Sequence, residues 1–255
     1  MALTDKQYTL IGAVRPKNPN TVIVNYSGSP VDLSNVYYLV AAIMQAWFPG
    51  QEAGYDIARV LTGKTNPCGR LSMSWPRNIE DNASFPNWPT QDNDVIRYEE
   101  EIFGGYKHYD LPGAVAPLFP FGFGLSHTTF KVAEIATSGS LDGVNEKISV
   151  SCKVSNTGDV EGKTVVQFHI QGPADTRIHR AVKELKAFRK LFVEAKATET
   201  VIAELEKYTV SYYDIDADSW RAVKGKYHVL VGLSAGEVVG STSFDVREDF
   251  LWKGL

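Results

Sequence analysis

A small set of aromatic and acidic residues in the first half of the chain has the chemistry of a pocket for a small ligand. Aromatic side chains supply flat apolar walls, and a carboxylate supplies an oriented hydrogen-bond acceptor. The residues with this combination are Trp47, Glu52, Trp88, Tyr98, Glu99 and Tyr106. The sequence therefore predicts a ligand site on the face that residues 47–52 share with the segment 88–106, where the turn 47–52 follows a strand and opens a helix.

Each of these residues also has a purely structural interpretation. Glu52 follows a Pro-Gly turn at the expected start of a helix, where the helix dipole stabilises a carboxylate by about 0.3–1 kcal/mol. Trp47 ends an apolar segment and suits a core, and the other aromatics suit the packing of one segment on another. A paired-carboxylate site would need Glu99 to converge with Glu52 or Asp32. Both interpretations stay open on the sequence alone.

The remaining reactive side chains predict no metal and no cofactor. His169, His179 and His228 fall in segments with strand character and are expected to be ordinary strand residues. Cys68 and Cys152 lie far apart, and neither has a Cys or His neighbour at the spacing of metal ligands. Two unpaired thiols and an N-terminus without a secretory signal pattern favour a cytoplasmic location.

Composition excludes two classes of partner. The chain has 255 residues, 44% of them hydrophobic and 22% charged, which is typical of a soluble globular protein. Its formal charge of −4 argues against nucleic acid, because a phosphate-binding surface needs a basic excess. Spanning a membrane needs about 20 consecutive apolar residues, and the sequence has no such run.

Residues 1–75 alternate between helical and strand patterns. Helices are expected at 3–14, capped by Thr4 or Asp5, and at 51–61, and apolar strands at 21–26, 40–47 and 71–75. This order predicts a parallel α/β sheet. Three strands make a small share of such a domain, so the sequence predicts a partial α/β domain.

The rest of the chain has two further sequence patterns. Residues 76–126 are rich in proline, glycine and aromatic residues, and predict an ordered connector. Residues 127–255 alternate with period two and predict an antiparallel immunoglobulin-like β-sandwich of about seven strands with regular surfaces and no cluster of site residues. The expected strands lie at 148–154, 164–170, 185–192, 201–205 and 227–232.

Several motifs together resemble one known family. They are AWFPGQEAG at 46–54, NPCGRLSMSWP at 66–76, YEEEIFGGYK at 98–107, PFGFGLSHTTF at 120–130 and DFLWKGL at 249–255. In this order they resemble the C-terminal part of the fungal and yeast β-glucosidases of glycoside hydrolase family 3. The resemblance implies the end of an α/β sandwich domain, a connector and a fibronectin type III-like domain.

The resemblance also implies where the chemistry lies. Family members carry a nucleophilic Asp in a barrel and an acid/base Glu upstream of the helix that here begins near Leu3. The resemblance includes no barrel, so the Asp is not expected in this sequence. The Glu is not expected either, since no Glu precedes Glu52. The chain departs from the family at residues 32–39 (DLSNVYYL), where relatives usually carry a Pro-Trp pair at the start of a helix.

Two functions fit these observations. In the first, the chain is the C-terminal region of a β-glucosidase-like hydrolase, not hydrolytic alone, that associates with a missing barrel segment or with itself. In the second, it is a stand-alone protein that uses the same scaffold to bind a carbohydrate or partner, or for a new small-molecule reaction. The expected ligand is a β-glucoside or another small molecule.

Overall fold

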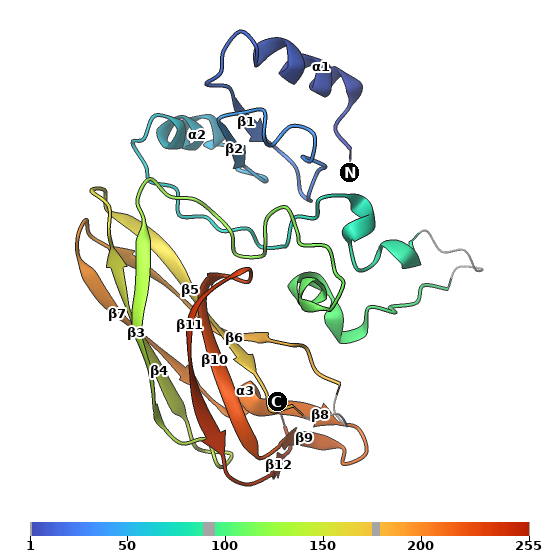
Figure 1. The fold of residues 1–255 in the computed structure, drawn as a ribbon, viewed down its shortest axis with the longest axis vertical. Coiled ribbons are helices and arrows are strands. Elements are labelled where there is room, and N and C mark those ends of the chain that lie inside the picture. The colour runs from blue at the N-terminus through green and yellow to red at the C-terminus, as the bar shows by residue number, and fades with distance from the viewer. Residues whose placement is uncertain (1, 89–94, 175–178, 255) are drawn as a thin grey trace. The chain divides into compact units, whose positions relative to one another are not determined.

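The chain divides into two compact units (Figure 1). The computed structural model describes residues 2–88, 95–174 and 179–254. The first unit comprises residues 1–65 and 74–119, and the second comprises 66–73 and 120–255. The domain limits expected from the sequence (1–75, 76–126 and 127–255) stay predictions. Among the described residues, no helix has the length and apolar character that crossing a membrane requires.

The first unit contains the two predicted helices and the first two predicted strands. Helix α1 (Asp5–Val14) begins in a capping box, in which the Gln7 N–H donates to Thr4 Oγ1 and the Thr4 N–H donates to Gln7 Oε1. Strands β1 (Val22–Asn25) and β2 (Ala42–Gln45) pair in parallel, and α2 (Ala53–Leu61) follows. These four elements confirm the predictions made for them.

The predicted third parallel strand at 71–75 is wrong. Within the described residues the parallel sheet has two strands, and Trp75 instead forms an isolated antiparallel bridge with Phe119. The Leu71 N–H donates to the Phe123 oxygen in the second unit. The Gly122 N–H donates in turn to the Leu71 oxygen, so the two segments are joined by separate hydrogen bonds rather than by a regular ladder.

Turns occupy most of the remainder of the first unit. Residues 34–39 form turns, in which the Val36 and Tyr37 N–H groups both donate to the Leu33 oxygen. The connector is built from short 3-10 helices rather than regular elements. They are Ile79–Asp81, Phe85–Asn87, Glu101–Phe103 and Gly105–Asp110.

The second unit is a β-sandwich with an additional small sheet. One sheet has the order β11-β10-β5-β6, the facing sheet has the order β3-β4-β7, and the third has the order β12-β9-β8. A short helix, α3 (Lys207–Val210), precedes β8. The strands are β3 (Phe130–Gly139), β4 (Ile148–Asn156), β5 (Gly162–Gln171), β6 (Glu184–Val193), β7 (Thr198–Leu205), β8 (Ser211–Asp214), β9 (Ser219–Ala222), β10 (Gly225–Ser234), β11 (Glu237–Val246) and β12 (Phe250–Trp252).

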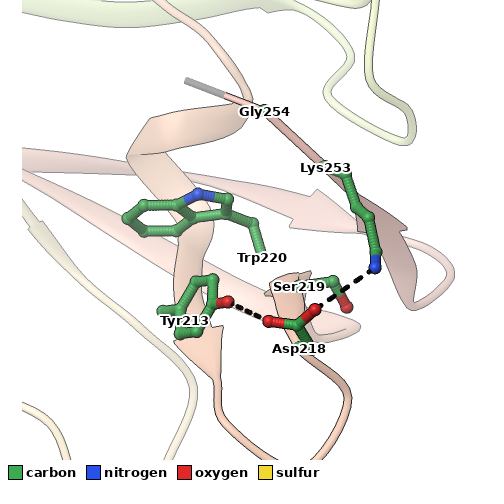
Figure 2. A pocket seen from close by; sticks show the side chains of 6 residues that line it. All are labelled: Tyr213, Asp218, Ser219, Trp220, Lys253 and Gly254. Atoms are coloured by element: carbon green, nitrogen blue, oxygen red, sulfur yellow. Dashed lines mark hydrogen bonds and ion pairs between the residues drawn. The ribbon is translucent and has the colours of Figure 1, made fainter.

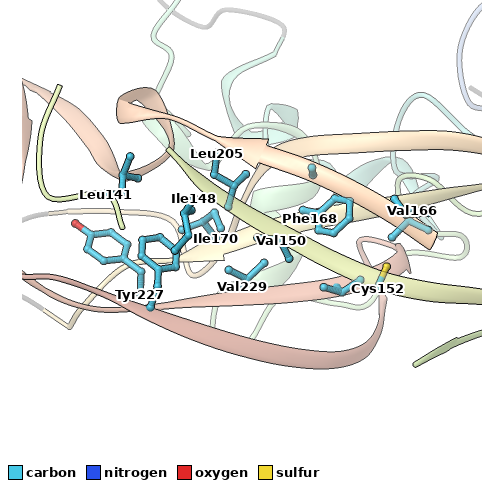
Figure 3. Close-up of a cluster of buried hydrophobic side chains, with 14 of the residues drawn as sticks. Leu141, Ile148, Val150, Cys152, Val166, Phe168, Ile170, Leu205, Tyr227 and Val229 are labelled. Carbon is cyan, nitrogen blue, oxygen red and sulfur yellow. The ribbon is translucent and has the colours of Figure 1, made fainter. Parts of the chain in front are cut away.

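The core of the second unit follows from residue alternation along these strands (Figure 3). Every second residue of β4 points inward, from Ile148 to Val154, and meets Phe168 of β5 and Val229 of β10 in one buried cluster. Five of the strands confirm the five predicted from the sequence. Cys152 lies in this core, and burial raises the pKa of its thiol to about 11, so it is an inert packing residue.

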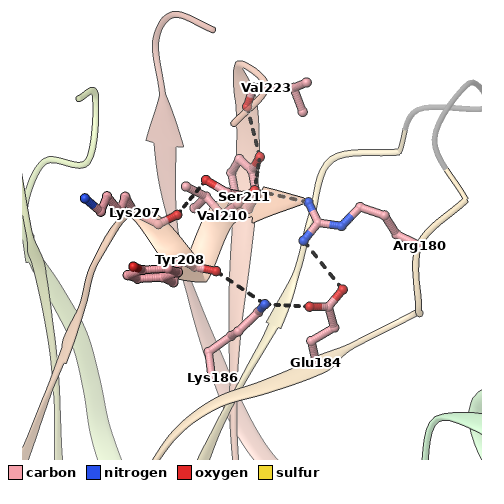
Figure 4. A network of polar contacts seen from close by, with 9 residues as sticks. Arg180, Glu184, Lys186, Lys207, Tyr208, Val210, Ser211 and Val223 are labelled. Carbon is pink, nitrogen blue, oxygen red and sulfur yellow. Dashed lines mark hydrogen bonds and ion pairs between the residues drawn. The ribbon is translucent and has the colours of Figure 1, made fainter. Parts of the chain in front are cut away.

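A polar network joins β6 to α3 beside the small third sheet (Figure 4). The Glu184 carboxylate lies 2.6 Å from Lys186 Nζ and 3.6 Å from Arg180 Nη2. Arg180 Nη1 donates to the Val210 oxygen and Lys186 Nζ to the Tyr208 oxygen. The two cations therefore hold the chain that leads into β8 at a fixed position on the sandwich.

Candidate functional site

Amide side chains bridge the carboxyl ends of the two parallel strands. Asn25 ends β1 and Gln45 ends β2, and the two residues are partners in register. Asn25 Nδ2 donates to Gln45 Oε1 (2.5 Å) and to Ser27 Oγ (2.8 Å), and Gln45 Nε2 donates to the Ser27 oxygen (2.9 Å). This edge of an α/β sheet is where ligands bind, and here it presents a fixed set of polar groups.

Trp47 leaves this edge in an unusual backbone conformation. Its φ of +54° lies in the left-handed region, which costs a non-glycine residue about 1–3 kcal/mol unless its surroundings hold it there. The Trp47 ring meets the ring of Trp75 at 6.3 Å between centroids. Trp75 is only 1% exposed, and its Nε1 donates to the Val31 oxygen. The conformation therefore directs a partly exposed indole onto a buried, anchored one.

Phe48 and Glu52 lie on the outer side of the same turn. Phe48 is 84% exposed, and its ring passes so close to Gly28 that a Cβ there would lie 2.7 Å from it. Glu52 is the N-cap residue of α2, as the helix-start interpretation expects, and its side chain makes no capping hydrogen bond. Its carboxylate is exposed and available to a ligand or partner.

The candidates from the connector are mostly exposed. Trp88 is 65% and Tyr98 is 77% exposed, and Glu99 is exposed as well, whereas Tyr106 is half-buried in the last 3-10 helix. Asp32, the other residue considered for a carboxylate pair, accepts hydrogen bonds from the backbone and hydroxyl of Ser34. The Trp47 ring contacts the ring of Trp75 rather than an aromatic residue of the segment 88–106. The site spanning 47–52 and 88–106 stays a prediction.

Trp75 is the residue of this region that the sequence analysis missed. Its position at the end of an apolar segment predicts a strand. The signal that distinguishes it is the proline that follows, Pro76, which ends such a strand and favours an irregular segment.

The expectation that the sandwich carries no cluster of site residues stays a prediction. Around a surface hollow of the small sheet β12-β9-β8 lie two aromatic side chains, Tyr213 and Trp220, and the charged pair Asp218–Lys253 (Figure 2). The histidines fit their structural interpretation better. His169 is buried on β5 and His228 exposed on β10, whereas His179 precedes β6 and is not on a strand. Within the described ranges, no three His, Cys, Asp or Glu residues gather as a metal site would require.

Comparison with known proteins gives two domain matches. Residues 1–127 match the glycosyl hydrolase family 3 C-terminal domain, and residues 164–235 match the fibronectin type III-like domain. A β-glucosidase from Kluyveromyces marxianus is 42% identical over 258 residues, which is 100% of this chain and 30% of that protein. A β-glucosidase from Rhizobium radiobacter is 38% identical over 98% of this chain and 30% of its own length.

Solved structures give the same relationship. The crystal structure of the Kluyveromyces marxianus β-glucosidase in complex with glucose matches all of this chain and 30% of that one, with a TM-score of 0.91 and 38% identity. β-Glucosidase 3B from Thermotoga neapolitana in complex with glucose matches with a TM-score of 0.88 and 33% identity over 99% of this chain and 35% of that one. The chain thus spans about a third of these relatives.

Proposed function

We propose that this member of glycosyl hydrolase family 3 forms one wall of the substrate site of a β-glucosidase-like hydrolase. Because the chain matches the C-terminal part of the family, we also propose that it is not hydrolytic alone. The carboxyl groups that perform the chemistry are supplied by a preceding barrel segment. Most of the length of the relatives has no counterpart in these 255 residues, which supports this division of roles.

The turn after β2 carries the proposal. Trp47 is held at φ +54° against Trp75, next to the Asn25 and Gln45 amides at the carboxyl edge of the sheet. A pyranose ring has an apolar face that packs on an aromatic ring, and hydroxyl groups that hydrogen-bond to amides and carboxylates. The turn therefore has the chemistry to contact and orient a glucoside.

The reaction itself needs groups of another kind. Retaining hydrolysis uses two carboxyl groups about 5–5.5 Å apart, one as the nucleophile and one as the acid and then base. Glu52 and Glu99 are both exposed, on separate segments, and Glu52 is the N-cap residue of α2. We assign both to binding: each carboxylate accepts a hydrogen bond from a sugar hydroxyl or a partner donor.

The exposed apolar surface of the first unit supports a partner. Neither α1 nor α2 has a buried residue, and among the described residues of this unit the buried large apolar side chains are Leu33, Val36 and Trp75. Leu10 and Leu61 are about half exposed or more. Burying apolar surface contributes about 25 cal/mol per Å². We propose that the barrel segment covers this surface and that a second copy covers it when the barrel is absent.

A chimera tests the substrate-wall role. The matching C-terminal 30% of the Kluyveromyces marxianus β-glucosidase is replaced by this chain, and hydrolysis of an aryl β-glucoside is followed. The chimera is expected to be active, and Trp47→Ala to lower kcat/KM by about 10- to 100-fold, because a misplaced substrate loses effective molarity. Phe188→Ala, an exposed aromatic of the sandwich, is the matched control.

The outcomes separate the two domains. Loss of activity with Trp47→Ala, Glu52→Gln or Glu99→Gln, with Phe188→Ala unchanged, supports the proposal. Full turnover by all three variants, together with loss of activity on changes at His169 or His179, would contradict the proposal and would indicate a site on the sandwich instead.

A further inference from the structure

The surface hollow of the small third sheet is assembled from segments that are distant in sequence. It has a volume of about 510 Å³. Its residues come from β8, the turn between β8 and β9, the start of β9, and the segment after β12, as Figure 2 shows. They are Tyr213, Asp218, Ser219, Trp220, Lys253 and Gly254. The size falls within the range of small-molecule sites.

Stacked indoles fix the aromatic wall of this hollow. Trp220 stacks on Trp252 with ring centroids 5.4 Å apart and planes 10° from parallel. Trp252 is buried, and its Nε1 donates to Ser211 Oγ (3.0 Å). Tyr213 meets Trp220 edge-on at 5.7 Å. Because one face of Trp220 is anchored on the buried Trp252, the indole is oriented before any ligand arrives.

The polar groups of the hollow are linked to one another. Asp218 Oδ1 accepts a hydrogen bond from the Tyr213 hydroxyl (2.6 Å), and Asp218 Oδ2 lies 3.4 Å from Lys253 Nζ. The Asp218 backbone is left-handed (φ +44°), which Asp tolerates better than most residues, and its N–H donates to the Ile215 oxygen. A carboxylate, an ammonium group and a phenol hydroxyl therefore lie beside the aromatic wall.

These groups define the ligand by its chemistry. The aromatic wall favours a ligand with an apolar face, and the lysine and aspartate cancel in charge, so an ionic ligand gains nothing from the local field. The acceptor and donors of the Asp218–Lys253 pair suit adjacent hydroxyl groups. We propose that this hollow binds a neutral hexopyranose or a short oligosaccharide, as a carbohydrate site on the fibronectin type III-like domain. The inference goes beyond the proposed hydrolase role, because binding here requires no turnover.

Saturation-transfer NMR on the whole chain tests this site. Methyl β-D-glucoside and cellobiose are the probes, at concentrations up to about 20 mM because one exposed aromatic wall predicts an affinity near the millimolar range. The expected result is transfer to the ring C–H protons of the sugar. We expect Asp218→Asn to weaken binding at least fivefold, and Trp220→Ala to remove the transfer that this hollow contributes, with Phe188→Ala as the control at an exposed aromatic residue of the same unit.

Asp218→Asn changes an exposed turn, so it tests the site even if Trp220→Ala fails to fold. Three results would overturn the inference. The first is no saturable transfer to either sugar. The second is transfer that Asp218→Asn and a folded Trp220→Ala leave unchanged. The third is phenol binding at least as well as the glucoside and displacing it, since that would define an apolar patch without selection for hydroxyl groups.

Discussion

Asn156 is a buried polar side chain with all of its hydrogen-bonding capacity used. Its Nδ2 donates to the Val160 oxygen (2.8 Å) and the Val193 oxygen (3.1 Å). Its Oδ1 accepts from Thr128 Oγ1 (2.5 Å) and from the Gly158 N–H (3.1 Å). Two donors and two acceptor sites are the full complement of an amide side chain, so this one residue ties together three segments of the sandwich: the segment leading into β3, the turn after β4 and the end of β6.

We expect Asn156→Ala to lower the free energy of unfolding by about 2–4 kcal/mol, because it leaves buried carbonyl and hydroxyl groups without partners. Urea denaturation measures the change. Asn145→Ala is the matched control at an exposed turn position and is expected to change stability by less than about 0.5 kcal/mol. Equal effects of the two substitutions would contradict the role given to the Asn156 network.

His169 makes stability depend on pH. It is fully buried on β5, and burial, with a smaller effect from Lys183, lowers its pKa to about 4. The unfolded state takes up a proton near pH 6.5 and the folded state does not, so stability falls as the pH drops from about 6.5 to about 4. At about 1.36 kcal/mol per pKa unit, the loss approaches 3 kcal/mol.

His169→Gln removes this titration, and its unfolding free energy is expected to change less between pH 6.5 and 4 than that of the unmodified chain. Urea midpoints measured across this range give the comparison. His228→Gln, at an exposed position of β10, is expected to keep the original pH dependence. An unaltered slope in His169→Gln would show that other groups cause the acid sensitivity.

Among the elements, long strands with a regular alternation of apolar residues could be predicted from the sequence, and short strands could not. Strands β4, β5 and β10 alternate over nine or ten residues and were recognised from that pattern. Strands β8, β9 and β12 have three or four residues, too few for a period to stand out. The surface hollow at Trp220 could not be predicted for the same reason, because these short strands bring its residues together.

The segment 71–75 shows the opposite error. Residues 71–75 are apolar enough for a buried strand, but their backbone bonds go to a proline-interrupted segment almost 50 residues later. Such long-range pairing is invisible to local pattern. The turn at 47–52, in contrast, was placed correctly between β2 and α2, because Pro49 and Gly50 mark it in the sequence.

Substitutions on β12 test how the third sheet is held. Trp252 is buried and Leu251, its neighbour, is about half exposed. We expect Trp252→Ala to cost about 3–5 kcal/mol, as for other large-to-small core changes, and Leu251→Ala less than about 1 kcal/mol. Thermal unfolding followed by near-ultraviolet circular dichroism measures both. Similar losses for the two variants would mean that the strand, rather than the buried indole, provides the stability.

Across the whole molecule, the two units differ in how much of their apolar surface is buried in a core. The sandwich has a continuous core from Leu141 to Val246, whereas α1 and α2 bury no residue. The two-stranded sheet β1-β2 also has open edges among the described residues, and open strand edges favour association. The purified chain is therefore expected to behave as a sandwich joined to a unit that needs a partner.

Self-association is the expected result when that partner is absent. Light scattering over a range of protein concentrations should give a mass above the 28.2 kDa of one chain. Leu61→Lys, which charges an exposed apolar position of α2, is expected to shift the equilibrium toward the monomer. A single 28.2 kDa species at high concentration would contradict the need for a partner.

The need for a separate catalytic segment is tested by the initial rate of hydrolysis of an aryl β-glucoside. The rate is measured for this chain alone and after addition of the separately expressed N-terminal part of the Kluyveromyces marxianus β-glucosidase. We expect no rate above background for the chain alone, because we propose that the nucleophile and the proton donor come from the other segment. We also expect a rate that rises with chain concentration and saturates once the two parts are combined. Turnover by the chain alone at a rate comparable with a full-length relative would contradict the proposal, and would require a carboxylate pair within these 255 residues.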